Sequence, residues 1–125
     1  MPNIHRITPF MHVPDIEAAL HFFTEILGFK CWFRQGTYAY VQREAAAFRL
    51  LQNHEDDGAP PGNRRFAYYC DVEDLAALLE ELKPRLDTLP EGDVCGPRDQ
   101  PYGQRELMIL APDGNLLVFG QDIGA

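Results

Sequence analysis

The sequence predicts an α+β fold of two βαβββ modules, each a four-stranded mixed sheet with a helix on its outer face, which together form a concave cleft. Two observations support this prediction. The order strand, capped helix, strands occurs twice within 125 residues. The pattern V-x-D-[IL]-x-A-[AL]-L also stands at the strand-to-helix junction of both copies, so that a shift of 59 residues places Asp15 on Asp74.

The first module is expected over residues 4–52 and begins with a strand over residues 7–13. Asp15 stands where an N-cap belongs, and the apolar residues after it follow helical spacing. Gly28 suits the left-handed end of that helix. Three short strands are expected next, over residues 29–34, 37–43 and 46–51.

A linker is expected over residues 53–63, because this stretch holds two glycines and two prolines. The second module is expected over residues 64–121, with a strand, a helix that Asp74 caps, weak strand material at residues 93–96 and a closing hairpin. The two modules are expected to form a single domain over residues 1–125.

The hairpin turn is expected at residues 111–115, Ala-Pro-Asp-Gly-Asn, between two apolar runs. Gly114 can adopt the positive φ that such a turn requires.

Composition excludes several classes of function. The net charge of -8 argues against nucleic acid, since phosphate binding needs a basic surface. The three cysteines are widely spaced and include no C-x-x-C pair, so neither a zinc knuckle nor a disulfide framework is expected. No secretory leader and no apolar run of membrane-spanning length is present. We therefore expect a cytoplasmic protein without a membrane partner.

Two longer stretches resemble a known family. They are PFMHVPDIEAALHFFTEILGF at residues 9–29 and QPYGQRELMILAPDGNLLVF at residues 100–119. Their P-x-x-x-V-x-D, L-G-F, Q-P-[WY]-G-x-R-E and P-x-G-N motifs resemble the vicinal oxygen chelate superfamily (glyoxalase, bleomycin resistance protein, dioxygenase), and most closely its bleomycin resistance branch. Ala111 departs from the family's usual Asp. The resemblance implies the two-module fold and a homodimer.

The resemblance also implies where a metal would bind. Enzymes of the superfamily hold a divalent metal with His, Glu or Gln on the first strand of each module and Glu on the last strand. In this sequence those positions are Thr8, Ala67 and Val118. Thr binds such metals poorly, and Ala and Val cannot bind them. We therefore expect no metal, no other cofactor and no catalytic residue.

An alternative remains open, in which the chain is a metal-dependent glyoxalase- or dioxygenase-type enzyme with a displaced metal site. His12 shares strand parity with Thr8, so it is expected to face the cleft. Glu106 lies on a neighbouring strand, and Tyr69 could complete such a site.

Aromatic residues indicate what the cleft could bind. Through the resemblance, Phe33 and Tyr38 fall on aromatic positions of the drug groove, and Tyr102 falls on the groove's tryptophan. Phe10 and Tyr69 share strand parity with Thr8 and Ala67, so they are expected to face the cleft as well. Flat rings suit planar ligands, which they bind by offset stacking.

Charged residues are expected at the rim of the cleft, where Arg105 and Glu106 form either an ion pair or ligand contacts. Arg43 is expected to be a surface charge. The predicted function is non-catalytic binding and sequestration of a planar or aromatic small molecule, which could be cationic, as in bleomycin resistance. The ligand-binding residues are predicted to be Phe10, His12, Trp32, Phe33, Tyr38, Tyr69, Tyr102, Arg105 and Glu106.

Overall fold

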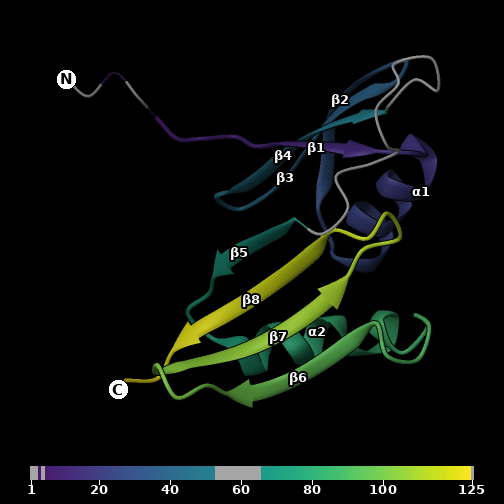
Figure 1. Cartoon of the computed structure of the whole chain (residues 1–125). Helices are drawn as coiled ribbons and strands as arrows, with labels where there is room; N and C mark the ends of the chain where they lie inside the picture. The colour runs from purple at the N-terminus through teal and green to yellow at the C-terminus, as the bar shows by residue number, and fades with distance from the viewer. Residues whose placement is uncertain (1–2, 4, 53–65, 125) are drawn as a thin grey trace.

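The computed structural model describes residues 3, 5–52 and 66–124 (Figure 1). The predicted linker at residues 53–63 lies outside the described residues. Over the described range the chain forms two four-stranded mixed sheets and two main helices, so the predicted α+β class and the two βαβββ modules are confirmed. Among the described residues, no helix is both long enough and apolar enough to cross a membrane.

Sheet one has the strand order β1-β4-β3-β2. The outer strand β1 pairs with β4 in parallel, and the other pairs are antiparallel. The strands are β1 (Phe10–Val13), β2 (Lys30–Gln35), β3 (Tyr38–Arg43) and β4 (Ala46–Gln52).

Sheet two repeats this topology as β5-β8-β7-β6, again with one parallel pair, β5 with β8. The hairpin that joins β7 to β8 turns where the sequence predicts, and Gly114 has φ +90°. The strands are β5 (Ala67–Asp71), β6 (Val94–Asp99), β7 (Gln104–Leu110) and β8 (Leu116–Asp122).

Both helices begin at the predicted caps. The carboxylate of Asp15 accepts the amide N–H groups of Glu17 and Ala18 before α1 (Ile16–His21), and Asp74 accepts that of Ala77 before α2 (Leu75–Leu86). After α1 the chain continues as a π-helical turn, η1 (Phe22–Ile26), which helical spacing did not predict. Gly28 then follows with φ +75°, as expected for a left-handed helix end.

Two strand bounds differ from the predicted ones by three residues, and the other predicted bounds differ by at most one. β1 begins at Phe10 rather than at residue 7, because Pro9 has no N–H with which to continue the ladder, although its carbonyl still accepts from Arg49. β6 runs on to Asp99 through a register shift between Cys95 and Arg98. Because β6 is an edge strand, it tolerates a proline at such an irregularity.

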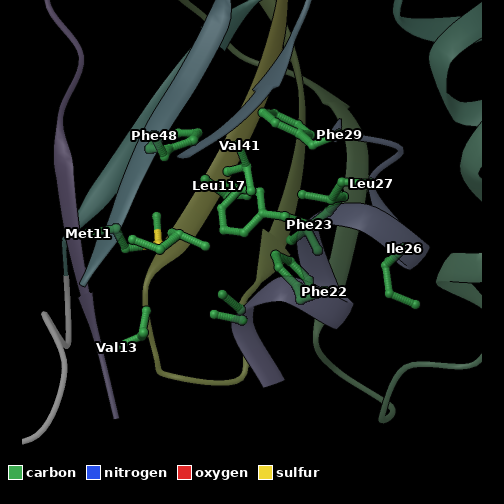
Figure 2. Close-up of a cluster of buried hydrophobic side chains, with 14 of the residues drawn as sticks. Met11, Val13, Phe22, Phe23, Ile26, Leu27, Phe29, Val41, Phe48 and Leu117 are labelled. Carbon is green, nitrogen blue, oxygen red and sulfur yellow. The ribbon is translucent and has the colours of Figure 1, made fainter. Parts of the chain in front are cut away.

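The buried side chains of both modules form one cluster (Figure 2). Phe23 of η1 lies near its centre, with ring centroids 5.2 Å from Phe29 and 5.3 Å from Phe48. Met11 and Leu117, from sheets one and two, are fully buried in the same cluster. Each sheet therefore has one face against the helices and core and one face free of them.

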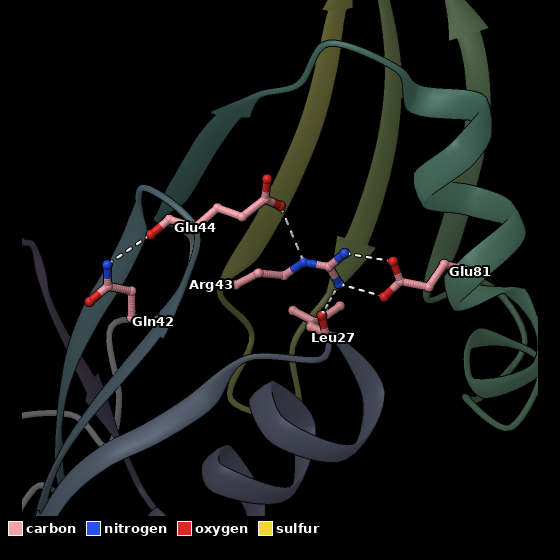
Figure 3. A network of polar contacts seen from close by, with 5 residues as sticks. All are labelled: Leu27, Gln42, Arg43, Glu44 and Glu81. Carbon is pink, nitrogen blue, oxygen red and sulfur yellow. Dashed lines mark hydrogen bonds and ion pairs between the residues drawn. The ribbon is translucent and has the colours of Figure 1, made fainter.

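A polar contact also joins the two modules (Figure 3). Arg43 of β3 donates from its two Nη atoms to both carboxylate oxygens of Glu81 on α2, at 2.8 and 2.7 Å. It donates as well to the carbonyl of Leu27, at 2.9 Å. The hydrogen bond from Arg43 lowers the pKa of Glu81, because it stabilises the carboxylate form. The expected surface charge is thus an inter-module contact.

Candidate functional site

The face of sheet one away from the core holds a group of aromatic rings. Alternation along β3 buries Ala39 and Val41 completely and turns Tyr38 to the other face. Phe33 on β2 lies beside Tyr38, with ring centroids 6.0 Å apart and an interplanar angle of 55°. Phe10 on β1 is half exposed. The structure thus places three predicted ligand-binding residues on one face of sheet one.

Two arginines complete this face, and neither was predicted. Arg49 on β4 is the register partner of Phe10. Its Nη1 donates to the Tyr38 hydroxyl at 2.6 Å, and its guanidinium lies 5.3 Å from the centre of the Tyr40 ring. Arg6 donates to the Tyr40 hydroxyl at 2.8 Å. The pairing of β1 with β4, which spans many residues in sequence, brings these groups together, so local sequence patterns did not reveal them.

The corresponding face of sheet two contains an open hollow of about 380 Å³. Three predicted ligand-binding residues, Tyr69, Tyr102 and Glu106, meet there. The described residues that line it are Tyr69, Asp71, Tyr102, Gln104, Glu106, Met108 and Val118, and they include no Lys, Arg or His.

Glu106 is the most buried acidic side chain of this hollow, with only 4% of its surface exposed. Its Oε1 accepts the hydroxyl hydrogen of Tyr102 at 2.8 Å. This hydrogen bond raises the pKa of Tyr102, because removing the phenol proton would leave two negative groups in contact.

Tyr69 is on β5, and its ring lies over β8, the strand beside it. Its hydroxyl donates to Oε1 of Gln104 at 2.9 Å, and a Cβ built on Gly120 would overlap that hydroxyl. Loss of hydration, together with the hydrogen bond and charge of Glu106, raises the pKa of Tyr69 to about 12. Gly120 is therefore required for the ring of Tyr69 to lie over β8, while 46% of the side chain stays exposed.

The other predicted ligand-binding residues lie outside these two groups or at their edges. His12 is on β1, with its ring 6.4 Å from Phe10. Trp32 is at the β2 register shift, where Lys30 Nζ lies 5.7 Å from its ring centre, and it lines a separate shallow hollow. Arg105 is paired with its register partner Asp99, at 2.6 Å, on the edge of sheet two.

The metal positions of the resembling enzymes do not fit a divalent metal in this chain. Thr8 precedes β1, Ala67 begins β5, and Val118 on β8 is the register partner of Tyr69. None of the three offers an imidazole or a carboxylate. His12 and Glu106 lie on separate sheets, and the part of the chain that the structure describes holds no group of three or more His, Cys, Asp or Glu placed to bind a metal.

A second hollow, of about 410 Å³, lies between the modules beside the Arg43–Glu81 contact. None of the nine predicted ligand-binding residues lines it. Cys70 does line it, and burial raises the pKa of its thiol to about 11. Because the thiol stays protonated near neutral pH, Cys70 is not an activated nucleophile.

Residues 3–119 match the family model of the Glyoxalase/Bleomycin resistance protein/Dioxygenase superfamily. The chain belongs to this superfamily. Membership agrees with the resemblance that the Q-P-Y-G-x-R-E and P-x-G-N motifs indicate. No curated protein matches the chain in sequence.

Solved structures of the superfamily share the fold over nearly the whole chain. The bleomycin-binding protein of Streptomyces verticillus, complexed with copper(II)-bleomycin, is 22% identical, with 100% of both chains covered and a TM-score of 0.75. The antibiotic-binding protein TnmS3 of Streptomyces sp. CB03234 is 24% identical, with 98% of this chain and 99% of that one covered and a TM-score of 0.71. A lactoylglutathione lyase of Agrobacterium tumefaciens is 17% identical, with 96% of both chains covered and a TM-score of 0.68.

Proposed function

We propose that this protein binds an aromatic small molecule and sequesters it without chemical change. The proposal rests on two features found together. Exposed rings stand on the open faces of both sheets, whereas the superfamily's metal positions hold Thr8, Ala67 and Val118. A scaffold that lacks those ligands but keeps an aromatic wall suits stoichiometric binding, which needs no reactive group.

The aromatic side chains favour a planar ligand. Tyr102 is 61% exposed, and Phe10 and Phe33 are about half exposed, which is unusual for large apolar residues without a partner. An offset-stacked ring pair contributes about 0.5–1.5 kcal/mol beyond the burial of its area. Two or three such contacts would therefore give a planar molecule a clear advantage over a flexible aliphatic one.

The similar solved structures share the fold with this chain and include both binding proteins and an enzyme. Two of them are named for binding bleomycin or an antibiotic. The lactoylglutathione lyase is also covered over nearly its whole length, so coverage does not distinguish a binding role from an enzymatic one. The side chains at the three metal positions support binding over catalysis, because they offer no ligand set for a metal-dependent lyase or dioxygenase at the superfamily's usual place.

We also propose that the protein acts as a homodimer, with sheet one of each copy covering sheet two of the other. Charge supports this arrangement, since Arg6 and Arg49 lie on the open face of sheet one and Asp71 and Glu106 lie in the hollow of sheet two. A ligand held between the two faces would contact rings from both copies.

We place the protein in the cytoplasm. Cys31, Cys70 and Cys95 are all free thiols, which a reducing compartment favours.

A thermal-shift titration with bleomycin and with planar polyaromatic antibiotics tests the proposed function. A ligand at about 100 times its Kd stabilises the fold by about 2.7 kcal/mol, which raises the melting temperature by several degrees. Tyr38→Ala and Tyr102→Ala should each weaken that shift, and Glu91→Ala, which lies outside both aromatic groups, should leave it unchanged. A shift that survives both tyrosine substitutions would place the ligand elsewhere.

A further inference from the structure

We propose that the hollow of about 410 Å³ between α2 and the β3–β4 turn is a second binding site, which takes a neutral aromatic molecule of one or two rings. This hollow, called the α2 hollow from here on, goes beyond the proposed function and does not depend on it. Among the described residues, Asp71 alone lines both the α2 hollow and the hollow on sheet two. Because α2 packs against the core face of sheet two, the α2 hollow stays accessible when a second copy covers the open sheet faces.

The internal repeat gives the α2 hollow a smaller counterpart. This counterpart, the α1 hollow, has a volume of about 120 Å³ and lies between the start of α1 and the β7–β8 turn. In both hollows a strand-to-helix junction of one module faces a hairpin turn of the other. A shift of 59 residues places lining positions of one hollow on those of the other, and they include Val13, Asp15 and Phe22 on one side and Val72, Asp74 and Glu81 on the other.

Rings of the chain itself fill most of the α1 hollow. Phe22 and Phe23 line it and are each only 1% exposed, and Figure 2 shows both rings within the core cluster. The corresponding residues of the α2 hollow are Glu81 and Leu82. Glu81 is half exposed and extends toward Arg43, and Leu82 carries no ring. The α2 hollow therefore has room for a ring that its counterpart already contains.

Polar contacts keep the walls of the α2 hollow apart (Figure 3). Arg43 lines it and joins β3 to Glu81 on α2, while it also donates to the carbonyl of Leu27. The guanidinium lies close to Gly28, where an added Cβ would come within 2.9 Å of Nη1 of Arg43. Because these contacts satisfy the charged groups within the chain, the hollow is formed before a ligand arrives, which lowers the cost of binding.

The floor of the α2 hollow is apolar. Phe29, Leu82 and Phe119 line it and are almost fully buried, and Cys70 adds a neutral thiol. Apolar walls without partner atoms lose dispersion contacts, which an apolar molecule would restore. A cavity of roughly 150 Å³ already holds a benzene-sized molecule. About 410 Å³ is therefore enough for two fused rings.

The charges around the α2 hollow select against an anionic ligand. Arg43 is the one cation of the lining among the described residues, and Glu81 already neutralises it. Glu44 and Glu73 add exposed carboxylates at the rim. An anion would lose hydration at the apolar floor and would meet these carboxylates without a free cation. A cation would lose hydration as well, and solvent-screened carboxylates offset little more than that cost, so a neutral molecule fits the lining best.

The experiment compares two probes that share one ring system. Two-dimensional ¹H–¹⁵N NMR on the full chain at pH 7 is used to titrate 2-naphthalenemethanol, which is neutral, and 2-naphthoate, which is an anion. We expect the alcohol to shift the amide signals of Cys70, Leu78 and Leu82 in a saturable way. The dissociation constant from these signals should be at least fivefold larger for 2-naphthoate. Signals of Tyr38 and Tyr102 report separately on binding at the open sheet faces.

Two substitutions fill the α2 hollow, and a third is their control. Leu82→Phe restores the ring that Phe23 supplies in the α1 hollow, and Ala77→Leu enlarges an exposed residue of the lining. Each should weaken binding of 2-naphthalenemethanol at least tenfold. Ala76→Leu makes the same change at the neighbouring exposed position of α2, which does not line the hollow, and should leave the affinity unchanged.

Several results would overturn the inference. The second site is wrong if the alcohol shifts no signal, or only those near Tyr38 and Tyr102, or if it binds Ala77→Leu as tightly as the wild type. Equal affinities for the alcohol and 2-naphthoate would overturn the assignment to a neutral ligand. Should Leu82→Phe not fold, as its NMR spectrum would reveal, Ala77→Leu decides the question. The bleomycin titration tests the open sheet faces, so the proposed function stands or fails separately.

Discussion

Replacing Arg43 by methionine tests how strongly the two modules are held together. Arg43→Met keeps the apolar stem of the side chain but removes the bidentate contact with Glu81 and the donor to the Leu27 carbonyl. Arg43 is 22% exposed and Glu81 is 50% exposed, so solvent screens their charges in part. Screening limits the ion pair to roughly 0.5–1 kcal/mol. The unsatisfied Leu27 carbonyl adds about 1 kcal/mol or more.

The free energy of unfolding should therefore fall by about 1.5–2.5 kcal/mol. For a domain of this size, that corresponds to a loss of roughly 5–10 °C in melting temperature. Urea denaturation and calorimetry measure both quantities. A double-mutant cycle with Glu81→Gln isolates the ion pair, whose coupling energy should lie near 0.5–1 kcal/mol. Glu80→Gln on the same helix is the matched control.

The pH dependence of this stability difference follows from the direction in which folding shifts the pKa of Glu81. The pKa of Glu81 is lowered in the folded state from its ordinary value of 4.5, so the unfolded chain binds this proton more readily. The contribution of Glu81 is therefore fully present above about pH 5 and is lost as the pH falls through the folded-state pKa. The difference between wild type and Arg43→Met should therefore be largest near neutral pH and should shrink in acid by the ion-pair part, roughly 0.5–1 kcal/mol, while the part due to the Leu27 carbonyl remains. A difference that does not shrink at all as the pH falls through the acid range, or a coupling energy of zero, would refute the reasoning.

Three further predictions concern other parts of the molecule. Gly120→Ala should displace the ring of Tyr69 and weaken binding of the antibiotic found in the thermal-shift titration severalfold, with little loss of stability; unchanged affinity would show that Tyr69 does not contact the ligand. Asp15→Ala should lower the free energy of unfolding by about 1 kcal/mol in urea denaturation. Asp15→Asn should lower it by much less, because the side-chain oxygen of asparagine can still accept the amide hydrogens at the start of the helix, whereas alanine cannot. Protein purified without chelators should contain no stoichiometric divalent metal by elemental analysis, and a metal lost on His12→Ala would favour the displaced-site enzyme.

Local signals predicted much of the fold. The caps at Asp15 and Asp74, the left-handed Gly28 and the turn at Gly114 act through contacts within a few residues, so sequence spacing alone locates them. The strand start at Phe10 was missed because Pro9 stands at the edge of the ladder, and the π-helical turn was missed because apolar spacing does not distinguish it from an α-helix.

The candidate site was predictable only in part. Strand parity identified Tyr69 and Phe10 as residues of the open faces, since alternation is a local property of strands. The role of Arg49 depends on the pairing of β4 with both β1 and β3, which no local pattern encodes. The same holds for Arg43, whose partner Glu81 belongs to the other module.

By itself, the sequence determined the repeat, the element order, the family motifs and the residues at the three metal positions. These are properties of spacing and identity, which the chain carries before it folds. Only the tertiary structure decided that Glu106 is buried against Tyr102 while Arg105 is bound to Asp99 at the edge of the sheet. Burial and charge pairing depend on which strands become neighbours, and strand pairing across the whole chain sets that arrangement.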